Sequence, residues 1–324
     1  MNTLLILGAG ASKAINHCFP TGFELLQSIN SHLFNDKNDV VSSPTEGKYV
    51  SDLTNKIISI IEGTTIDYES ELKVYKKELY RYTSAYEYEY LRRVLSKSIS
   101  IDDFTNQNNS PLFQTVSKYA TAHILKGAEH AFYESTNKKT ENWIELFLQE
   151  FSKDVTNLQN ISSRLKIVSF NYDRLFSYLF SEFVKRNHPG MKSVHQILDD
   201  SCINYLYGSL GSLNDIPFES PNDDMQKMIL AYTRFNLLER KSQSWQSDEK
   251  FDAIGFIGFG FDEQNFQNLN LEQFYTAKIY SSYCFRGALD NQRKLLERVF
   301  DRSKINYFHS VEKLITAITK LISK

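Results

Sequence analysis

Cysteine is scarce in this chain, and its cysteines form no close pair. The 324 residues include three, Cys18, Cys202 and Cys284, without a Cys-x-x-Cys spacing. Such a set is too sparse for a disulfide framework or for a structural zinc site built from paired cysteines. We therefore expect neither disulfides nor a metal, as is usual for proteins of the reducing cytoplasm.

Long apolar runs and an excess of one charge are also missing. The apolar run near the N-terminus, residues 4–7, is far shorter than the ~20 residues of a membrane-spanning helix, and no basic signal-peptide segment precedes it. The net charge is -2 and the pI is near 6.4, so no overall positive field attracts nucleic acid. With 41% hydrophobic and 23% charged residues the chain has a globular composition. We expect a cytoplasmic protein that binds neither membranes nor nucleic acid directly.

Short apolar runs alternate with helical patterns along most of the chain. Residues 3–7 predict a strand buried on both faces, which is typical of parallel sheets. Further β-rich runs follow later in the sequence, namely LKIVSF, CINYLYGSLG, FDAIGFIGFGFDEQN, KIYSSYCF and INYFHS. The alternation predicts an α/β fold with a Rossmann-like, doubly wound parallel sheet, formed by residues 1–35 and 159–324. Residues 36–158 are predicted to be a mostly helical insertion that covers the pocket.

The first predicted strand runs into a turn of small residues, GAGAS, at residues 8–12. Gly8 and Gly10 allow backbone N–H groups to approach an anion, and Ser12 adds a hydroxyl donor. A dinucleotide-dependent dehydrogenase has a third glycine where this chain has Lys13, and an acidic residue about 20 positions later after a second strand. Both features are missing. The turn therefore predicts either a phosphate site of another class or a tight turn with a structural role only.

Three further turns of small and polar residues follow predicted strands, in SFNYD, YLYGSLGSL and IGFGFDEQN. Ligands of open α/β sheets bind beyond the carboxyl ends of the strands, so Asn171 and Asp173 of SFNYD are expected to face that crevice. Either residue could instead cap the helix that follows. Four such turns along one rim of the sheet favour a large, nucleotide-sized ligand.

GAGAS, FPTG, SIDDF, SFNYD, YLYGSLG and IGFGFD occur in this order, and the set resembles the sirtuin-like NADase family of bacterial anti-phage defence systems. The resemblance implies an NAD+ hydrolase that cleaves the nicotinamide–ribose bond, with NAD as substrate and no metal. It implies an abortive role, in which NAD is depleted in the infected cell. Because such activity must be controlled, we expect a homo-oligomer and a separately encoded regulatory or sensor protein such as an ATPase.

The resemblance also implies roles for individual residues. Asn171 would lie beside the nicotinamide ribose and position the attacking water or hydroxyl, and Asp173 would hydrogen-bond the nicotinamide carboxamide. SIDDF, residues 100–104, would help to close the pocket. The residues expected to contact the dinucleotide are Gly8, Ala9, Gly10, Ser12, Thr21, Ser169, Gly208, Ser209, Gly258 and Gly260.

The chain departs from the family at Tyr207, where the family has histidine as a general base. A tyrosine hydroxyl has a pKa near 10 and is a poor base at pH 7, and loss of a general base typically lowers the rate ~10²–10⁴-fold. His17 follows the first turn and could reach the pocket, whereas His195 is expected at the surface. Three interpretations stay open: a slow enzyme, a regulatory subunit that binds NAD or ADP-ribose without turnover, and a sequence inactivated on purpose to trap a complex.

Overall fold

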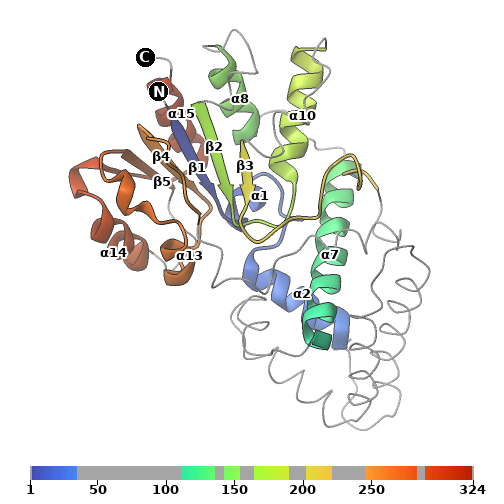
Figure 1. The fold of residues 1–324 in the computed structure, drawn as a ribbon. Helices are drawn as coiled ribbons and strands as arrows, with labels where there is room; N and C mark the ends of the chain where they lie inside the picture. Colours follow the sequence, from blue (N-terminus) through green and yellow to red (C-terminus); the bar gives the residue numbers. More distant parts are fainter. Residues whose placement is uncertain are drawn as a thin grey trace.

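The structure, a computed structural model, describes residues 2–34, 111–135, 142–153, 164–189, 202–220, 245–282 and 289–322. Within these ranges six strands form one sheet in the order β3-β2-β1-β4-β5-β6, and every pair of neighbours is parallel (Figure 1). The strands are β1 (Thr3–Leu7), β2 (Leu165–Ser169), β3 (Ile203–Tyr205), β4 (Ala253–Ile257), β5 (Lys278–Ser282) and β6 (Ile305–Phe308). The predicted α/β fold with a parallel, Rossmann-like sheet is therefore confirmed.

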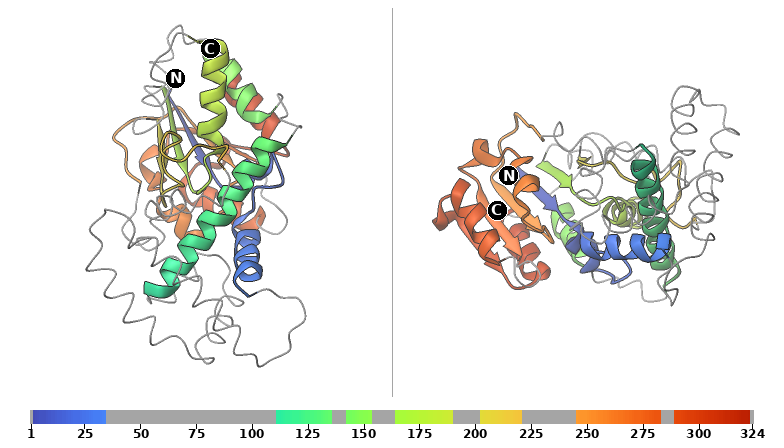
Figure 2. Two further views of the ribbon diagram at one scale, coloured as in Figure 1. Left: turned by 90° about the vertical axis from the view of Figure 1, so that its right-hand side faces the viewer. Right: turned by 90° about the horizontal axis from the view of Figure 1, so that it is seen from below.

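Helices cover both faces of this sheet (Figures 1 and 2). One face carries α8 (Trp143–Lys153), α10 (Leu175–Asn187) and α15 (Val311–Ile322), and the other carries α13 (Glu263–Gln267) and α14 (Leu289–Val299). The remaining described helices are α1 (Ala9–Lys13), α2 (Gly22–Phe34), α7 (Pro111–Glu134), η2 (Leu271–Phe274) and η3 (Arg302–Lys304). No helix in the described ranges combines the length and the apolar character needed to cross a membrane.

The central strands β1 and β4 are buried along their whole length. Successive side chains of a strand point to opposite faces, so Leu4 and Ile6 belong to one core cluster and Leu5 and Leu7 to the other. Both faces need an apolar surface because both are covered by helices. This explains why β1 is continuously apolar and does not alternate between apolar and polar residues.

The strand order places a topological switch point between β1 and β4. From β1 the chain builds the sheet toward β3, and from β4 it builds the sheet in the opposite direction toward β6. The chain therefore leaves β1 and β4 toward opposite edges of the sheet, and the carboxyl ends of such a strand pair are the usual ligand position in open α/β sheets.

The predicted division into a sheet domain and an insertion stays a prediction, because residues 35–110 lie outside the described ranges. Two helices within the predicted insertion are described. α7 packs against α2, whereas α8 packs against α10 and α15 and contributes to the core beneath the sheet. In space, α8 thus belongs with the sheet and its covering helices.

Candidate active site

Three polar residues that are far apart in the sequence meet beyond the carboxyl ends of β1 and β2. Ser12 of α1 donates a hydrogen bond from Oγ to Oδ1 of Asp173 over 2.8 Å, and it accepts one from Nδ2 of Asn171 over 3.2 Å. All three residues are buried. The structure therefore brings together the GAGAS and SFNYD turns, as the sequence predicted, and we call these residues the Ser12–Asn171–Asp173 cluster.

The cluster lines a small cavity on the side of the sheet that α8 and α10 cover. Its volume is about 10 Å³, which is roughly the room that one water molecule needs. Ser169 and the aromatic residues Trp143 and Tyr205 contribute to the remaining wall. The indole of Trp143 donates a hydrogen bond to the carbonyl oxygen of Ala11 over 2.9 Å, so α8 is fastened to the turn that carries Ser12.

The side-chain oxygen of Asn171 is buried and receives no hydrogen bond from the described residues. Ser12 has one hydroxyl proton, which Asp173 accepts, so the Asn171 amide directs Nδ2 toward Ser12. A buried acceptor without a donor costs about 1–3 kcal/mol, and native proteins contain few of them. A water molecule or a ligand hydroxyl in the cavity would satisfy this oxygen.

Asp173 accepts a hydrogen bond from the start of α10, and its carboxyl group has a raised pKa. Its Oδ1 accepts the backbone N–H of Leu175, the first residue of α10, over 3.1 Å, whereas the N-cap position of this helix is Arg174, which makes no side-chain cap. Burial raises the pKa of its carboxyl to about 6, although the hydrogen bonds from Leu175 and Ser12 act in the opposite direction. Asp173 thus binds the start of α10 and also carries a carboxylate that titrates close to neutral pH.

A buried network of charged residues lies beside the cluster. Arg174 and Glu129 of α7 form a bidentate pair, with Nε to Oε1 over 3.1 Å and Nη2 to Oε2 over 2.6 Å. Lys126, also on α7, donates to the carbonyl oxygen of Phe218 over 2.6 Å, and its Nζ lies 3.5 Å from Glu129. Burial lowers the pKa of Lys126 to about 8. These three side chains are at most 1% exposed.

The glycines of the first turn pack against the turn that follows β4. Gly8 donates its N–H to the carbonyl oxygen of Ile257 over 3.0 Å, and Gly10 donates to that of Gly258 over 3.1 Å. A Cβ at Gly8 would lie 2.4 Å from the Gly258 oxygen, which is too close for any side chain. This packing alone accounts for both glycines, with no need for a ligand. It also uses two of the backbone N–H groups that were expected to face a pyrophosphate.

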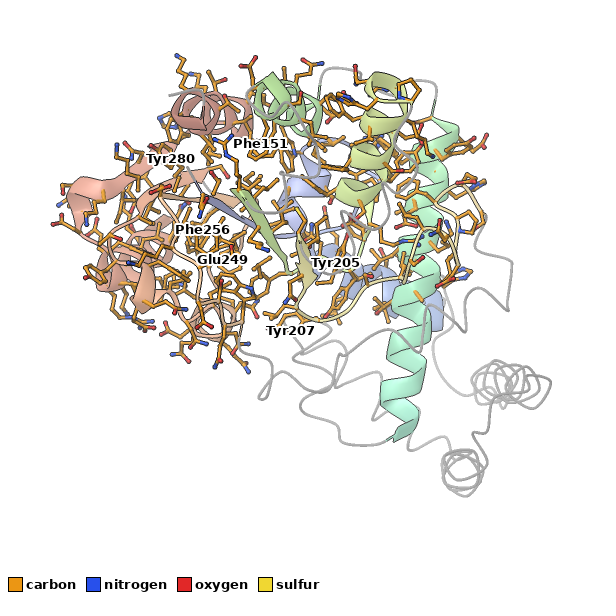
Figure 3. The ribbon with its side chains drawn as sticks, turned by 45° about the horizontal axis from the view of Figure 1, so that its top comes forward. Phe151, Tyr205, Tyr207, Glu249, Phe256 and Tyr280 are labelled. Carbon is orange, nitrogen blue, oxygen red and sulfur yellow. The ribbon has the colours of Figure 1, made fainter. Side chains whose placement is uncertain are left out.

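Tyr207 lies apart from the Ser12–Asn171–Asp173 cluster. Its hydroxyl donates to Oδ1 of Asn265 over 2.7 Å and accepts from Nδ2 of Asn268 over 3.1 Å, so it joins the turn after β3 to the region of α13. It packs in the core cluster of the opposite sheet face and does not line the cavity. Figure 3 labels Tyr205 beside β3 and Tyr207 beyond the strand end. A role for Tyr207 at the site stays a prediction.

The remaining predicted residues are distributed around the strand ends. Thr21 caps α2, because its hydroxyl accepts the Glu24 N–H over 3.4 Å, while its own N–H and hydroxyl donate to the Glu24 carboxylate over 2.8 Å. Ser209 accepts the N–H of Gly211 over 3.2 Å, and the exposed side chain of His17 does not line the cavity. Gly208 and Gly260 have no described contact with the cluster. SIDDF, His195 and Cys284 lie outside the described residues.

Several residues at the site could not be found from the sequence. Tyr205 and Trp143 line the cavity, and Glu129 binds the residue next to Asp173, yet each resembles an ordinary core or surface residue of its own element. Arg174 could have been suspected from its position, since it directly follows the SFNYD motif. A charged side chain on a helix is usually solvated, so the burial of Glu129 becomes evident only when α7 packs beside α10.

No group of histidine, cysteine and acidic residues in the described ranges could hold a metal ion. Comparisons of the chain with protein-family models, with curated proteins and with solved structures gave no match. The resemblance to the sirtuin-like NADases therefore stays a prediction that rests on the quoted motifs.

Proposed function

We propose that the chain binds NAD+ at the carboxyl edge of the sheet and hydrolyses its nicotinamide–ribose bond. The observation that carries the proposal is the Ser12–Asn171–Asp173 cluster. In it, a buried Asn171 oxygen that has no donor in the described ranges lies beside a cavity the size of a water molecule. The position next to the β1–β4 switch point supports a nucleotide ligand. The quoted motifs direct the choice to NAD+.

The cavity leaves room for the attacking water but not for the dinucleotide. We place the water against Oδ1 of Asn171, and the dinucleotide in the crevice above it. The water oxygen bonds to C1′ of the ribose while the carbon–nitrogen bond breaks, nicotinamide leaves as a neutral base, and the water loses a proton to solvent. Asp173 is largely ionised at pH 7, because its pKa is about 6, and its charge stabilises the cationic ribose of the transition state.

The biological part of the proposal rests on the motifs alone. NAD depletion would act in the cytoplasm as an abortive anti-phage defence, in a homo-oligomer controlled by a separately encoded sensor such as an ATPase. Such control is needed because unregulated hydrolysis of NAD would kill the healthy cell.

A second function is favoured by Tyr207. Its hydroxyl is engaged by Asn265 and Asn268, and no histidine of the described residues lines the cavity. A chain that binds NAD or ADP-ribose without cleaving it, and that regulates a partner, fits this arrangement. Asn265 and Asn268 match the donor and the acceptor of a tyrosine hydroxyl, which favours Tyr207 as the native residue.

One experiment separates these functions. Purified protein is incubated with NAD+, released nicotinamide is measured by chromatography, and binding of NAD+ and ADP-ribose is measured by calorimetry. Asn171→Ala should abolish release, and Asn204→Ala, an exposed asparagine of β3, should leave it unchanged. Binding without release in the parent supports the second function, above all if Tyr207→His then creates release. Absence of both binding and release would contradict both functions.

A further inference from the structure

We propose that Glu129 of α7 is a positioning residue for the Ser12–Asn171–Asp173 cluster and acts through Arg174. The catalytic part of this inference rests on the proposed function, whereas the placement of Asp173 can be tested without it. In the part of the chain that the structure describes, Glu129 forms no hydrogen bond with the cluster, so its influence would pass through the residue that follows Asp173.

Glu129 binds both the side chain and the backbone of Arg174. Its Oε1 accepts the Arg174 N–H over 3.1 Å as well as Nε over 3.1 Å, and its Oε2 accepts Nη2 over 2.6 Å. The bidentate geometry fixes the plane of the guanidinium group as well as its distance from the Glu129 carboxylate. The peptide unit between Asp173 and Arg174 is therefore held from α7.

Two carboxylates hold consecutive N–H groups at the start of α10. Glu129 accepts the backbone N–H of Arg174, and Asp173 accepts the backbone N–H of Leu175. These N–H groups have no partner within the helix, and the positive end of the helix dipole attracts negative charge. The same two bonds therefore set where α10 begins and where the Asp173 carboxyl lies.

Arg174 extends this restraint to the turn after β3. Its Nη1 donates to the carbonyl oxygens of Gly211, Ser212 and Ile216, over 3.2, 3.2 and 2.7 Å. A buried ion pair alone adds little or nothing to stability compared with an apolar pair. A set of five hydrogen bonds from one arginine side chain to an acid and three carbonyl oxygens is better explained by the geometry that it fixes. Because a shift of about 1 Å can cost ~10²-fold in rate, a loose Arg174 would impair the cluster.

The test compares Glu129→Gln with Glu145→Gln. Glu145 is a matched control, since it is a buried carboxylate of α8 that pairs with Arg186 at the other end of α10. We expect Glu129→Gln to lower kcat for nicotinamide release by ~10–100-fold with little change in KM, and Glu145→Gln to leave both unchanged. A role in stability alone would lower the melting temperature of both variants and leave kcat at temperatures where they stay folded.

The second readout is the titration of Asp173, followed by carbon NMR of its carboxyl group. Among the described residues, the titratable groups that act on Asp173 are Glu129, Arg174, Cys18 and Tyr205, and Lys126 lies beside Glu129. The negative charge of Glu129 raises the pKa of Asp173, so Glu129→Gln should lower it, while Glu145→Gln should not. Because Glu129→Gln also releases the Arg174 guanidinium, the carbon shift of protonated Asp173 should change too.

A compensated variant covers the case in which Glu129→Gln does not fold. Glu129→Gln/Lys126→Met removes one buried charge of each sign and keeps the net charge of the network. An unchanged kcat and an unchanged Asp173 titration in either folded variant would overturn the proposal. If the parent neither binds nor cleaves NAD+, the proposed function fails, and the Asp173 titration still decides whether Glu129 positions this carboxyl.

Discussion

The turns after β2 and β4 each carry an aspartate near the start of a helix, in very different surroundings. Each places an acidic residue just before a helix, Asp173 before α10 and Asp262 before α13, and each carboxylate accepts a backbone N–H of that helix. Asp173 is buried against Ser12, whereas Asp262 is exposed. An aspartate near a helix start is thus an ordinary helix cap in the turn after β4 and an acid with a raised pKa in the turn after β2.

The other residues of the two turns extend this contrast. Beyond β4, Phe259 and Phe261 pack against Phe256, with ring centroids 5.8 and 5.2 Å apart, and Gly258 fits against the first turn. Beyond β2, Asn171 and Asp173 turn polar atoms toward a cavity. The turn after β4 therefore shapes the crevice by packing, and the turn after β2 supplies its chemistry. The following predictions test this division.

The largest effect is expected at Gly258. Its φ is +59°, and an added Cβ would lie 2.0 Å from the backbone nitrogen of Ala11, so Gly258→Ala brings both strain and overlap. We expect the free energy of unfolding to fall by about 3–5 kcal/mol in urea titrations. Gly260→Ala is the control, since a Cβ there meets no atom within 4 Å, and its effect should stay within about 1 kcal/mol. Equal losses for the two variants would contradict the assigned packing.

The next effect concerns the pH dependence of stability. Asp173 has a pKa of about 6 in the folded chain and 3.8 as its ordinary value, so the folded state binds this proton more tightly. Its contribution to stability is present below about pH 4 and is lost as the pH rises toward 6, by roughly 3 kcal/mol. Asp173→Asn should remove this loss, so that the variant gains stability relative to the parent between pH 4 and pH 7.

Asp262→Asn is the matched control for that measurement. Asparagine caps helices about as well as aspartate, and Asp262 is exposed. Its stability should follow that of the parent within about 0.5 kcal/mol at every pH. A pH-dependent gain in Asp262→Asn as large as that in Asp173→Asn would show that the two turns do not differ in the way described.

The smallest effect is expected for the two tyrosines at β3. Tyr207→Phe removes the hydroxyl that Asn265 and Asn268 share and should lower the free energy of unfolding by about 1–2 kcal/mol. Tyr205→Phe removes one hydrogen bond, to Ser177 over 2.7 Å, and should cost about 1 kcal/mol. Because Tyr205 lines the cavity in which we place the attacking water, its variant should lower the rate of nicotinamide release more than Tyr207→Phe does. The reverse order in the release assay would place the reacting centre near Tyr207.

Much of the fold could be predicted from the sequence, because it is encoded locally. The bounds predicted for the first strand, residues 3–7, agree with β1, and the later β-rich runs contain β2 to β6. Apolar runs without alternation predict strands covered on both faces, and their alternation with helices predicts parallel pairing. The motifs also indicated Ser12, Asn171 and Asp173, which the structure brings together.

The remainder depends on contacts between distant parts of the chain. The sequence alone determined a doubly wound sheet with polar turns along one rim, since strand pattern and turn residues are local properties. The folded structure was needed to show that the Asn171 oxygen has no donor among the described residues, that Glu129 is buried against Arg174, and that Tyr207 binds Asn265 and Asn268. Burial and hydrogen-bond partners come from residues tens of positions away. The turn after β2 therefore became a candidate active site, and the turn after β4 a packed apolar turn, only when the chain folded.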